Sequence, residues 1–411
     1  MKKFEQLIKY GAENIFSDIH IGGGSKTVFR QHGINHSNNQ FVWSHKELDA
    51  LVGQLLDEYQ KDTLLTRHSV DLSRTVQKVR LRMHIFHAMT GFSISIRLLP
   101  GKVHSIEGVN LHPSLKNFCK PGPGLILVCG ASGSGKTTTI AAIIEEINRN
   151  HSANIVTLED PVEYIFNSKK SLIVQRELGI QIPSYKQGLI DIMREDLDVV
   201  MVGELRTAEE MTLALHAAES GHLVIASLHA STPEEAIYRI CNSATAELQE
   251  MIRHQLAVAL KLLITQEFYF LKDFGFRVPM LSIMVNTQST RGIIRDNNLS
   301  QIESTLQTSR DDGMYSIDQY RSYLDNRKDY SPPSVVFKPS SEDESGAALF
   351  HTPTLFLSRQ KGAEIKKTED KRVSHHEKKI QKEDKSIDEL SPHYVINEDT
   401  RLDEIIKEIK K

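Results

Sequence analysis

The sequence predicts an α/β fold built around a mainly parallel β-sheet. In the middle of the chain, short apolar runs alternate with helical patterns, as in a parallel sheet covered by helices on both faces. A segment of mixed strands and helices precedes this region, and a highly charged tail follows it. The composition, 39% hydrophobic and 25% charged, is that of an ordinary globular protein.

Length, charge and cysteine content narrow the class of protein. The chain has 411 residues, enough for two ordinary domains and a tail, and its formal net charge of −3 gives no general preference for nucleic acid or anionic membrane. Three scattered cysteines without a Cys-x-x-Cys pair support neither a disulfide framework nor a zinc ribbon, which fits the cytosol. The sequence shows no signal peptide and no membrane span, so any membrane association is expected to go through a partner.

Residues 1–100 are predicted to form an α+β domain. The amphipathic start of the chain predicts a helix with Phe4, Leu7 and Ile8 on its buried face, and residues 45–60 predict a second helix. Strands are predicted from the segments "SDIHI", "TVFRQHG", "KVRLRMHIFHA" and "GFSISIRLL". Residues 101–120 form a predicted linker, which "PGPG" closes.

Residues 121–325 are predicted to form the main domain. Helices are expected at 136–148 and 207–219, and residues 246–325 are expected to be mostly helical, with one strand near "PMLSIMV". The expected buried strands are "GLILVC", "NIVTLE", "DVVMVGE" and "HLVIASLH".

The last segment, 326–411, is predicted to be a largely disordered tail. Residues 331–411 contain 15 Lys or Arg and 16 Asp or Glu, with few aromatic residues, which is typical of a solvated segment. Its end, "RLDEIIKEIKK", places Leu402, Ile405, Ile406 and Ile409 on one helical face, so a short terminal helix is expected there.

The stretch "GASGSGKTT" predicts a phosphate-binding loop, because it fits G-x-x-x-x-G-K-[ST] between a predicted strand and a predicted helix. Its glycines allow backbone N–H groups to face phosphate oxygens at a helix N-terminus. Lys136 supplies a charge for the β- and γ-phosphates of ATP, and the Thr137 hydroxyl is a ligand for Mg²⁺. The expected nucleotide-binding residues are Gly130, Ala131, Ser132, Gly133, Ser134, Gly135, Lys136, Thr137 and Thr138.

Acidic residues follow two of the predicted strands. Glu204 ends the strand "DVVMVGE", and Glu159, Asp160 and Glu163 cluster where "NIVTLE" ends. Because the carboxyl ends of parallel strands meet at one edge of a sheet, these acids are expected near the phosphates that the predicted loop binds. Glu204 is therefore a candidate metal ligand or water activator. The alternatives are helix caps and solvated acids.

Histidine and arginine residues complete the candidate site. His229 stands at the carboxyl end of its strand, on the phosphate side, and is therefore a better candidate for a sensor residue than His222, which stands at the other end. Arg80 and Arg82 are two apart on a predicted strand and therefore share a face. With Arg97 they suit the charge of a leaving phosphate, since guanidinium binds phosphate in a bidentate manner. The alternative is that all three are surface arginines of their strands.

From about residue 3 to 325, the ordered motifs resemble the secretion-superfamily ATPases of the type IV pilus and type II secretion branch. The compact layout, without a long extra N-terminal domain or a cysteine-pair zinc insertion, is similar to the competence-pilus assembly ATPases of Gram-positive bacteria and to pilus retraction ATPases. The motifs are "SDIHI" with "RQHG", "RLRMHIF", "SIRLLP", "GASGSGKTTT", "VTLEDPVEY", "QRELG", "REDLDVVMVGELRTAEE", "AAESGHLVIASLHAST" and "GMYSIDQ".

The resemblance implies a PAS-like N-terminal domain, a RecA-like ATPase domain with a helical C-terminal part, and a homohexameric ring with ATP between the two domains. It implies a cytoplasmic motor that acts at the inner face of the membrane on an inner-membrane platform protein, and through it on pilins, without direct nucleic-acid contact. Glu204 matches the catalytic glutamate of the family, and Glu163 matches its Asp-box glutamate. Glu159 and Asp160 are then expected to help Thr137 hold magnesium, which leaves Glu204 to activate water. The expected catalytic residues are Glu204, Glu163, Lys136, Arg80, Arg82, Arg97 and His229.

A partial late motif leaves the cellular role open, and two departures from the family pattern concern the late-domain contacts and leave nucleotide binding intact. "STRGIIRD" is a partial echo of a late motif of retraction ATPases, Thr207 replaces a usual Asp, and "TQEF" at 265–268 replaces the usual Q-R-L. The leading hypothesis is a motor that assembles a competence pilus, and the alternatives within the family are a retraction motor and a type II secretion motor. A nucleic-acid motor is disfavoured by the single Trp and the absence of a basic-aromatic cluster. A non-hydrolysing scaffold is the remaining alternative.

Overall fold

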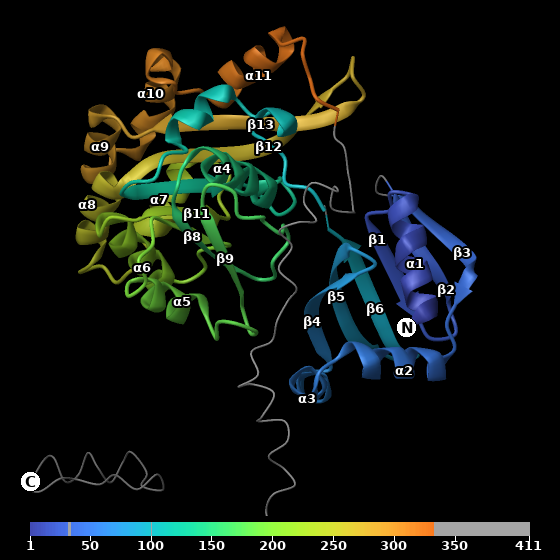
Figure 1. The fold of residues 1–411 in the computed structure, drawn as a ribbon. Coiled ribbons are helices and arrows are strands. Elements are labelled where there is room, and N and C mark those ends of the chain that lie inside the picture. The colour runs from blue at the N-terminus through green and yellow to red at the C-terminus, as the bar shows by residue number, and fades with distance from the viewer. Residues whose placement is uncertain (32–33, 100, 333–411) are drawn as a thin grey trace, which may run out of the picture. The chain divides into compact units, whose positions relative to one another are not determined.

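The computed structural model describes residues 1–31, 34–99 and 101–332. All of them fall within a single compact unit of the chain. They contain a six-stranded sheet and a seven-stranded sheet (Figure 1). The predicted tail from 333 onward, with its terminal helix, lies outside the described residues, as do His32, Gly33 and Pro100 of the motifs above.

The first sheet is antiparallel throughout, in the order β3-β2-β1-β6-β5-β4. Phe4, Leu7 and Ile8 are fully buried in its core, as predicted. The likeness to a PAS domain stays a prediction. The elements of this part are α1 (Lys2–Glu13), β1 (Asp18–Gly22), β2 (Lys26–Gln31), β3 (Ile34–Val42), α2 (His45–Leu55), α3 (Glu58–Arg67), β4 (Ser69–Val76), β5 (Val79–Ala88) and β6 (Gly91–Leu98).

The predicted helical stretch over 45–60 is confirmed, but it is divided between two helices. α2 ends at Leu55, and a new helix begins after Asp57, whose side chain accepts a hydrogen bond from the backbone N–H of Gln60. Asp followed three residues later by Gln is a capping box, which starts a helix wherever it falls in a longer amphipathic pattern. Strand β3 was not predicted, because almost all of its side chains are exposed and no apolar alternation marks it.

The second sheet has the order β13-β12-β7-β11-β10-β8-β9 and is parallel except for β13. This confirms the predicted α/β class with a mainly parallel sheet. Its strands are β7 (Gly124–Cys129), β8 (Asn154–Glu159), β9 (Leu172–Glu177), β10 (Val199–Val202), β11 (Leu223–Leu228), β12 (Leu260–Leu271) and β13 (Phe276–Val285).

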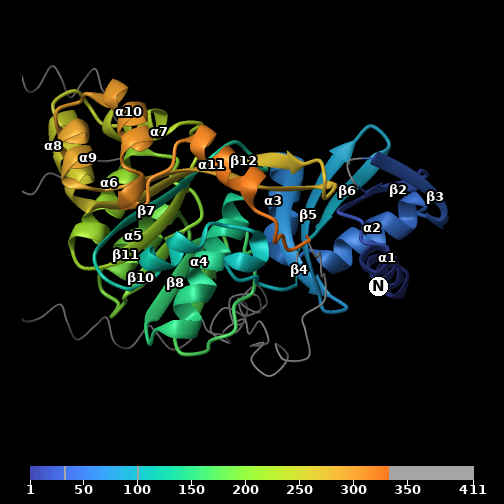
Figure 2. The same ribbon diagram turned by 90° about the horizontal axis from the view of Figure 1, so that it is seen from above.

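Two apolar cores cover the faces of this sheet. Figure 2 shows the arrangement of the helices around the sheet, seen from above. One core joins the sheet to α4 (Lys136–Asn150), to α11 (Ile317–Asn326) and to the 3₁₀ turns η1 (Glu107–Val109) and η2 (Pro113–Phe118) of the linker. The other core contains the remaining helices, which are α5 (Tyr185–Ile192), α6 (Ala208–Glu219), α7 (Pro233–Cys241), α8 (Gln249–Ala259), α9 (Gln288–Arg295) and α10 (Ile302–Thr308). The turns η3 (Leu299–Gln301) and η4 (Arg310–Asp312) flank α10.

The expectation that residues 246–325 are mostly helical, with a single strand, is wrong for β12. Helix α8 ends at Ala259 and β12 begins at Leu260, so no Gly, Pro or other turn signal marks the change. The strand near "PMLSIMV" is confirmed as β13, which pairs with β12 as a hairpin.

Parallel register brings the expected site to one edge of the sheet. β7, β11, β10 and β8 pair side by side, so the segments that follow Cys129, Leu228, Val202 and Glu159 leave the sheet at the same edge.

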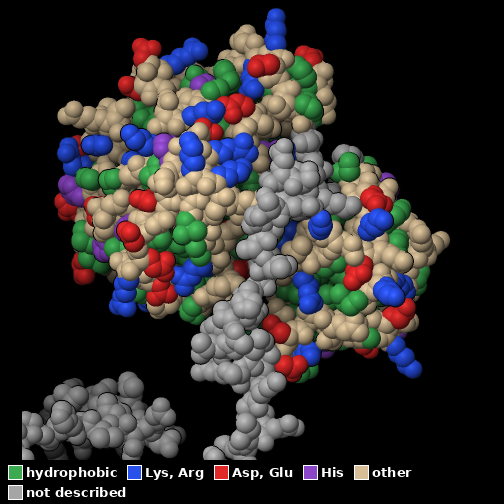
Figure 3. All heavy atoms as spheres, viewed as in Figure 1, with side chains coloured by type: hydrophobic (Ala, Val, Ile, Leu, Met, Phe, Trp, Pro, Cys, Tyr) green, Lys and Arg blue, Asp and Glu red, His purple; other side chains and the backbone are tan. Residues whose placement is uncertain are grey.

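On the face seen in Figure 3, acidic and basic side chains of the described residues are interspersed. No helix in the described part of the chain is long and apolar enough to cross a membrane.

Candidate functional site

The phosphate-binding loop joins β7 to α4, as predicted. Gly130 and Gly135 have φ values of +151° and +91°, a region that favours glycine. A Cβ atom on Gly130 would lie 2.5 Å from the carbonyl oxygen of Gln266, so a larger residue does not fit there. Ala131, Ser132 and Gly133 are exposed at the turn of the loop, whereas Ser134 is buried.

Gln266, on β12, supports this loop through two hydrogen bonds. Its Nε2 donates to the carbonyl oxygen of Ser134 at 2.6 Å, and its Oε1 accepts from Thr139 Oγ1 at 2.6 Å. All three side chains are buried. Gln266 therefore links the end of the loop to the first turn of α4, a role that the sequence analysis missed because it placed this segment in a helical region.

Lys136 folds back onto the loop. Its Nζ donates to the carbonyl oxygens of Gly130 and Ala131, at 2.9 and 3.0 Å. Partial burial lowers the pKa of Lys136, and the negative charge of Glu204 opposes that shift. Glu204 lies near the start of the loop, because the backbone N–H of Gly130 donates to the carbonyl oxygen of Leu228 at 3.3 Å and the next residue, His229, lies 3.1 Å from Glu204.

Glu204 lies at the carboxyl edge between Arg206 and His229. Its Oε2 accepts from Arg206 Nε at 2.9 Å, and its Oε1 lies 3.1 Å from His229 Nε2. Arg206 Nη1 also lies 3.4 Å from Asp160 Oδ2, which connects this group to the end of β8. The structure therefore brings together Glu204, His229 and Asp160, which the sequence placed at the ends of three separate strands.

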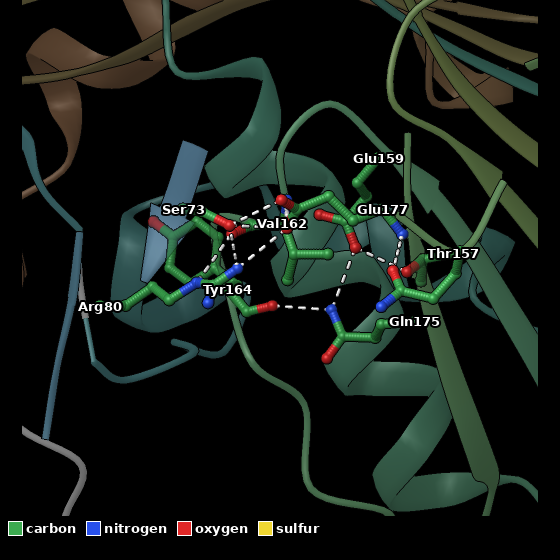
Figure 4. A network of polar contacts seen from close by, with 9 residues as sticks. Ser73, Arg80, Thr157, Glu159, Val162, Tyr164, Gln175 and Glu177 are labelled. Carbon is green, nitrogen blue, oxygen red and sulfur yellow. Dashed lines mark hydrogen bonds and ion pairs between the residues drawn. The ribbon is translucent and has the colours of Figure 1, made fainter. Parts of the chain in front are cut away.

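Glu159 differs from the other acids because its side chain is buried. Its Oε1 accepts hydrogen bonds from Thr157 Oγ1 at 2.6 Å and from Gln175 Nε2 at 3.0 Å (Figure 4). Burial raises the pKa of Glu159 to about 7. Its predicted role as a magnesium ligand stays a prediction, and the structure shows Asp160 as the more exposed carboxylate of this pair.

Tyr164 connects the acid-rich loop after β8 to the phosphate-binding loop. Its hydroxyl lies 2.9 Å from Thr138 Oγ1, and its carbonyl oxygen accepts from Gln175 Nε2 at 2.8 Å. Gln175 thus bonds both to the backbone of this loop and to Glu159. The sequence motif "QRELG" marked Gln175 without assigning it this role.

The three arginines have different environments. Arg80 is buried and pairs with Glu177, with 2.9 Å between Nη2 and Oε2, and its Nε donates to the carbonyl oxygen of Val162 at 3.3 Å (Figure 4). Arg82 lies 3.8 Å from Glu163. Arg97 is exposed, pairs with Asp18 at 2.9 Å and lies directly opposite Arg82 in the sheet.

Glu177 is the second functional residue that sequence reasoning missed. Besides Arg80, it accepts hydrogen bonds from Ser73 Oγ, at 2.7 and 2.8 Å, and from the backbone N–H of Val162 at 3.1 Å. One buried carboxylate therefore holds the loop that carries Glu163 against strands β4 and β5 of the first sheet. The motif "QRELG" contained this signal, but its glutamate is the last residue of β9, a short strand that was not predicted.

Removal of the Gln266 side chain tests its support of the loop. Gln266→Ala leaves the Ser134 carbonyl and the Thr139 hydroxyl buried without these bonds, which costs about 1–3 kcal/mol for each lost partner. We expect weaker binding of pyrophosphate, measured by calorimetry, and a lower unfolding midpoint in urea. Gln307→Ala, on an exposed face of α10, is the matched control and should change neither. Wild-type binding by Gln266→Ala would contradict this role.

The raised pKa of Glu159 predicts a pH-dependent stability. Between about pH 4.5 and 7 the folded chain holds a proton on Glu159 that the unfolded chain has released, so this group's contribution falls as pH rises and is fully unfavourable above pH 7. Glu159→Gln keeps an oxygen for Thr157 and Gln175 without the charge. The variant should unfold at a higher temperature than wild type at pH 8, and this advantage should shrink toward pH 5. An advantage that does not change with pH would contradict the shift.

Comparisons with known proteins agree with these motifs. The family model for type II/IV secretion system proteins matches residues 66–273. The uncharacterized protein YggR of Escherichia coli is 34% identical over 316 residues, 77% of this chain and 96% of that protein. The type IV pilus retraction ATPase PilT of Pseudomonas aeruginosa is 33% identical over 314 residues, 76% of this chain and 91% of that protein.

Solved structures give the same result. The crystal structure of the pilus retraction motor PilT with bound ADP matches with a TM-score of 0.69 and 32% identity, over 77% of this chain and 96% of that one. The competence protein ComGA of Bacillus subtilis is 36% identical over a shorter stretch of 177 residues, 42% of this chain and 49% of that protein. The predicted closeness to competence ATPases thus has weaker support than the family itself. This chain belongs to the type IV pilus and type II secretion ATPase family.

Proposed function

We propose that this chain is an ATP-hydrolysing motor of a type IV pilus and that it acts in pilus retraction. The observation that carries the hydrolysis proposal is Glu204, held at the carboxyl edge beside the phosphate-binding loop. The retraction role is supported by the similarity to PilT, which extends over three quarters of the chain. Assembly of a competence pilus, the leading hypothesis from sequence, is the second candidate, favoured by the match to ComGA.

The phosphate-binding loop binds the triphosphate in this proposal. Backbone N–H groups of 130–138 bind the phosphate oxygens, and Lys136 exchanges its two carbonyl contacts for the β- and γ-phosphates. When bound, Mg²⁺ neutralises the charge that develops on the phosphates. The half-buried hydroxyl of Thr137 and the exposed carboxylate of Asp160 suit an ion that keeps most of its waters and uses phosphate oxygens as ligands. Among the described residues no cluster of three or more His, Cys, Asp or Glu offers an all-protein metal cage.

Glu204 is the proposed base. Arg206 and His229 hold its two oxygens, and one of these oxygens accepts a proton from the attacking water. The water oxygen attacks the γ-phosphorus, the bond to the bridging oxygen breaks, and ADP leaves with the bonding electrons. Glu163, on the loop that Glu177 fixes, assists from the end of the neighbouring strand.

The arginines divide into two roles in this proposal. Arg80 is committed to Glu177 and Val162 and therefore positions the Glu163 loop within its own chain. Arg82 and Arg97 are more exposed and adjacent in the sheet, so they supply charge to the phosphates of their own subunit or of a neighbour in a homohexameric ring. The proposed ring works in the cytoplasm on an inner-membrane platform protein and reaches the pilins only through it.

Substitution of Glu204 separates binding from hydrolysis. Glu204→Gln should bind ADP and ATP at least as well as wild type and lose at least about 100-fold in steady-state hydrolysis, because water loses its proton acceptor. Phosphate release and calorimetry measure the two properties. Glu209→Gln, an exposed glutamate at the start of α6, is the matched control and should remain active. A Glu204→Gln protein with normal turnover would show that another residue is the base.

Deletion of the gene in a piliated host separates retraction from assembly. Loss of a retraction motor should leave cells with excess surface pili that no longer shorten, measured by electron microscopy and by live imaging of labelled pili. Complementation with Glu204→Gln should not restore shortening, whereas Glu209→Gln should. Cells without pili would favour the assembly motor over our proposal.

A further inference from the structure

The phosphate-binding loop has an aromatic neighbour that none of the roles above uses. β12 pairs with β7 in parallel as far as Thr265 and Cys129, so residues 266–271 continue beyond the end of β7, beside the loop. Gln266 and Phe268 are two apart and share a face of the strand. Gln266 is buried and hydrogen-bonded to the loop, and Phe268 is the next residue along the strand on the same face.

Phe268 lies against the loop yet stays open to solvent. A Cβ atom on Gly135 would lie 3.1 Å from Phe268 Cζ, but the Phe268 side chain is 44% exposed. Phe270, the next residue on that face, is 51% exposed. No ring–ring contact joins either residue to another aromatic side chain in the described part of the chain. One exposed apolar ring, Phe268, thus lies beside the phosphate-binding loop, and a second, Phe270, follows it on the same face of β12.

The order of the strands gives the direction of a bound nucleotide. Glu204 follows β10, and in the sheet β11 and β7 separate β10 from β12. In the proposed reaction the γ-phosphate lies on the Glu204 side of the loop, where water is activated. The α-phosphate and the nucleoside then extend to the other side, toward β12, where Phe268 lies.

We propose that Phe268, with Phe270 beside it, forms the platform on which the base of the nucleotide stacks. This inference rests on the proposed function, since it names the base subsite of the same site. Stacking of a base on an aromatic side chain contributes enough to change affinity several-fold to about a hundredfold on truncation to alanine. The base has its own π-face, and the exposed ring loses water-accessible apolar surface when the base covers it.

Two ligands that differ only in the nucleoside part test the platform. Calorimetry on the full chain with Mg²⁺ compares ADP with pyrophosphate, which has phosphates but no base. Phe268→Ala should weaken ADP binding roughly tenfold and leave pyrophosphate binding unchanged. Phe268→Trp should bind ADP at least as well as wild type, because it restores a larger ring. Thermal unfolding checks that each variant is folded.

Phe274→Ala is the matched control. Phe274 lies on the same hairpin with a similar exposure of 45%, but its ring packs on Tyr330 and Phe276, at centroid distances of 5.1 and 6.0 Å. Its removal should change the affinity for neither ligand. Wild-type ADP binding by Phe268→Ala would overturn the platform, and so would an equal loss of ADP and pyrophosphate, which would make Phe268 a support of the loop. If the wild-type chain binds neither ligand, the ATPase proposal fails with it.

Discussion

Parallel pairing of β8, β10, β11 and β7 is the constraint on which the candidate site depends. Within the sheet these strands are mostly apolar and almost entirely buried. The functional groups follow the last residue of each strand, and parallel register places those last residues at one edge. The 130–138 loop, Glu204 and His229 therefore come together although about 100 residues separate Gly130 from His229.

Buried polar contacts then fix the loops at this edge. Gln266 joins the phosphate-binding loop to the first turn of α4, and Tyr164 connects the same region to the loop after β8. Glu177 holds that second loop against the first sheet through Arg80 and Ser73. Each buried side chain here has partners in the network, and loss of one partner would leave the others unpaired at a cost of about 1–3 kcal/mol. A change in the relative position of the two loops would therefore break buried hydrogen bonds and cost free energy.

Local sequence patterns predicted the groups at the edge of the sheet but not the buried residues that hold its loops in place. The strand ends, the glycine-rich loop and the acids were all visible as short continuous motifs, so Lys136, Glu204 and His229 could be named from the sequence. Gln266 and Glu177 could not, because their roles depend on pairing between distant segments: β12 with β7, and β9 with β8. The capping box at Asp57 and the direct passage from α8 to β12 were misjudged for a related reason, since both boundaries fall inside continuous amphipathic or apolar patterns.

The central claim is that Glu204 activates water at a nucleotide held by the 130–138 loop. A structure of the full chain with Mg²⁺ and a non-hydrolysable ATP analogue tests it directly. The account predicts phosphates bound by the N–H groups of that loop and by Lys136, and an oxygen of Glu204 within about 2.6–3.2 Å of a water in line with the γ-phosphate. A bound γ-phosphate with Glu204 turned away, and another acid in contact with the in-line water, would contradict it.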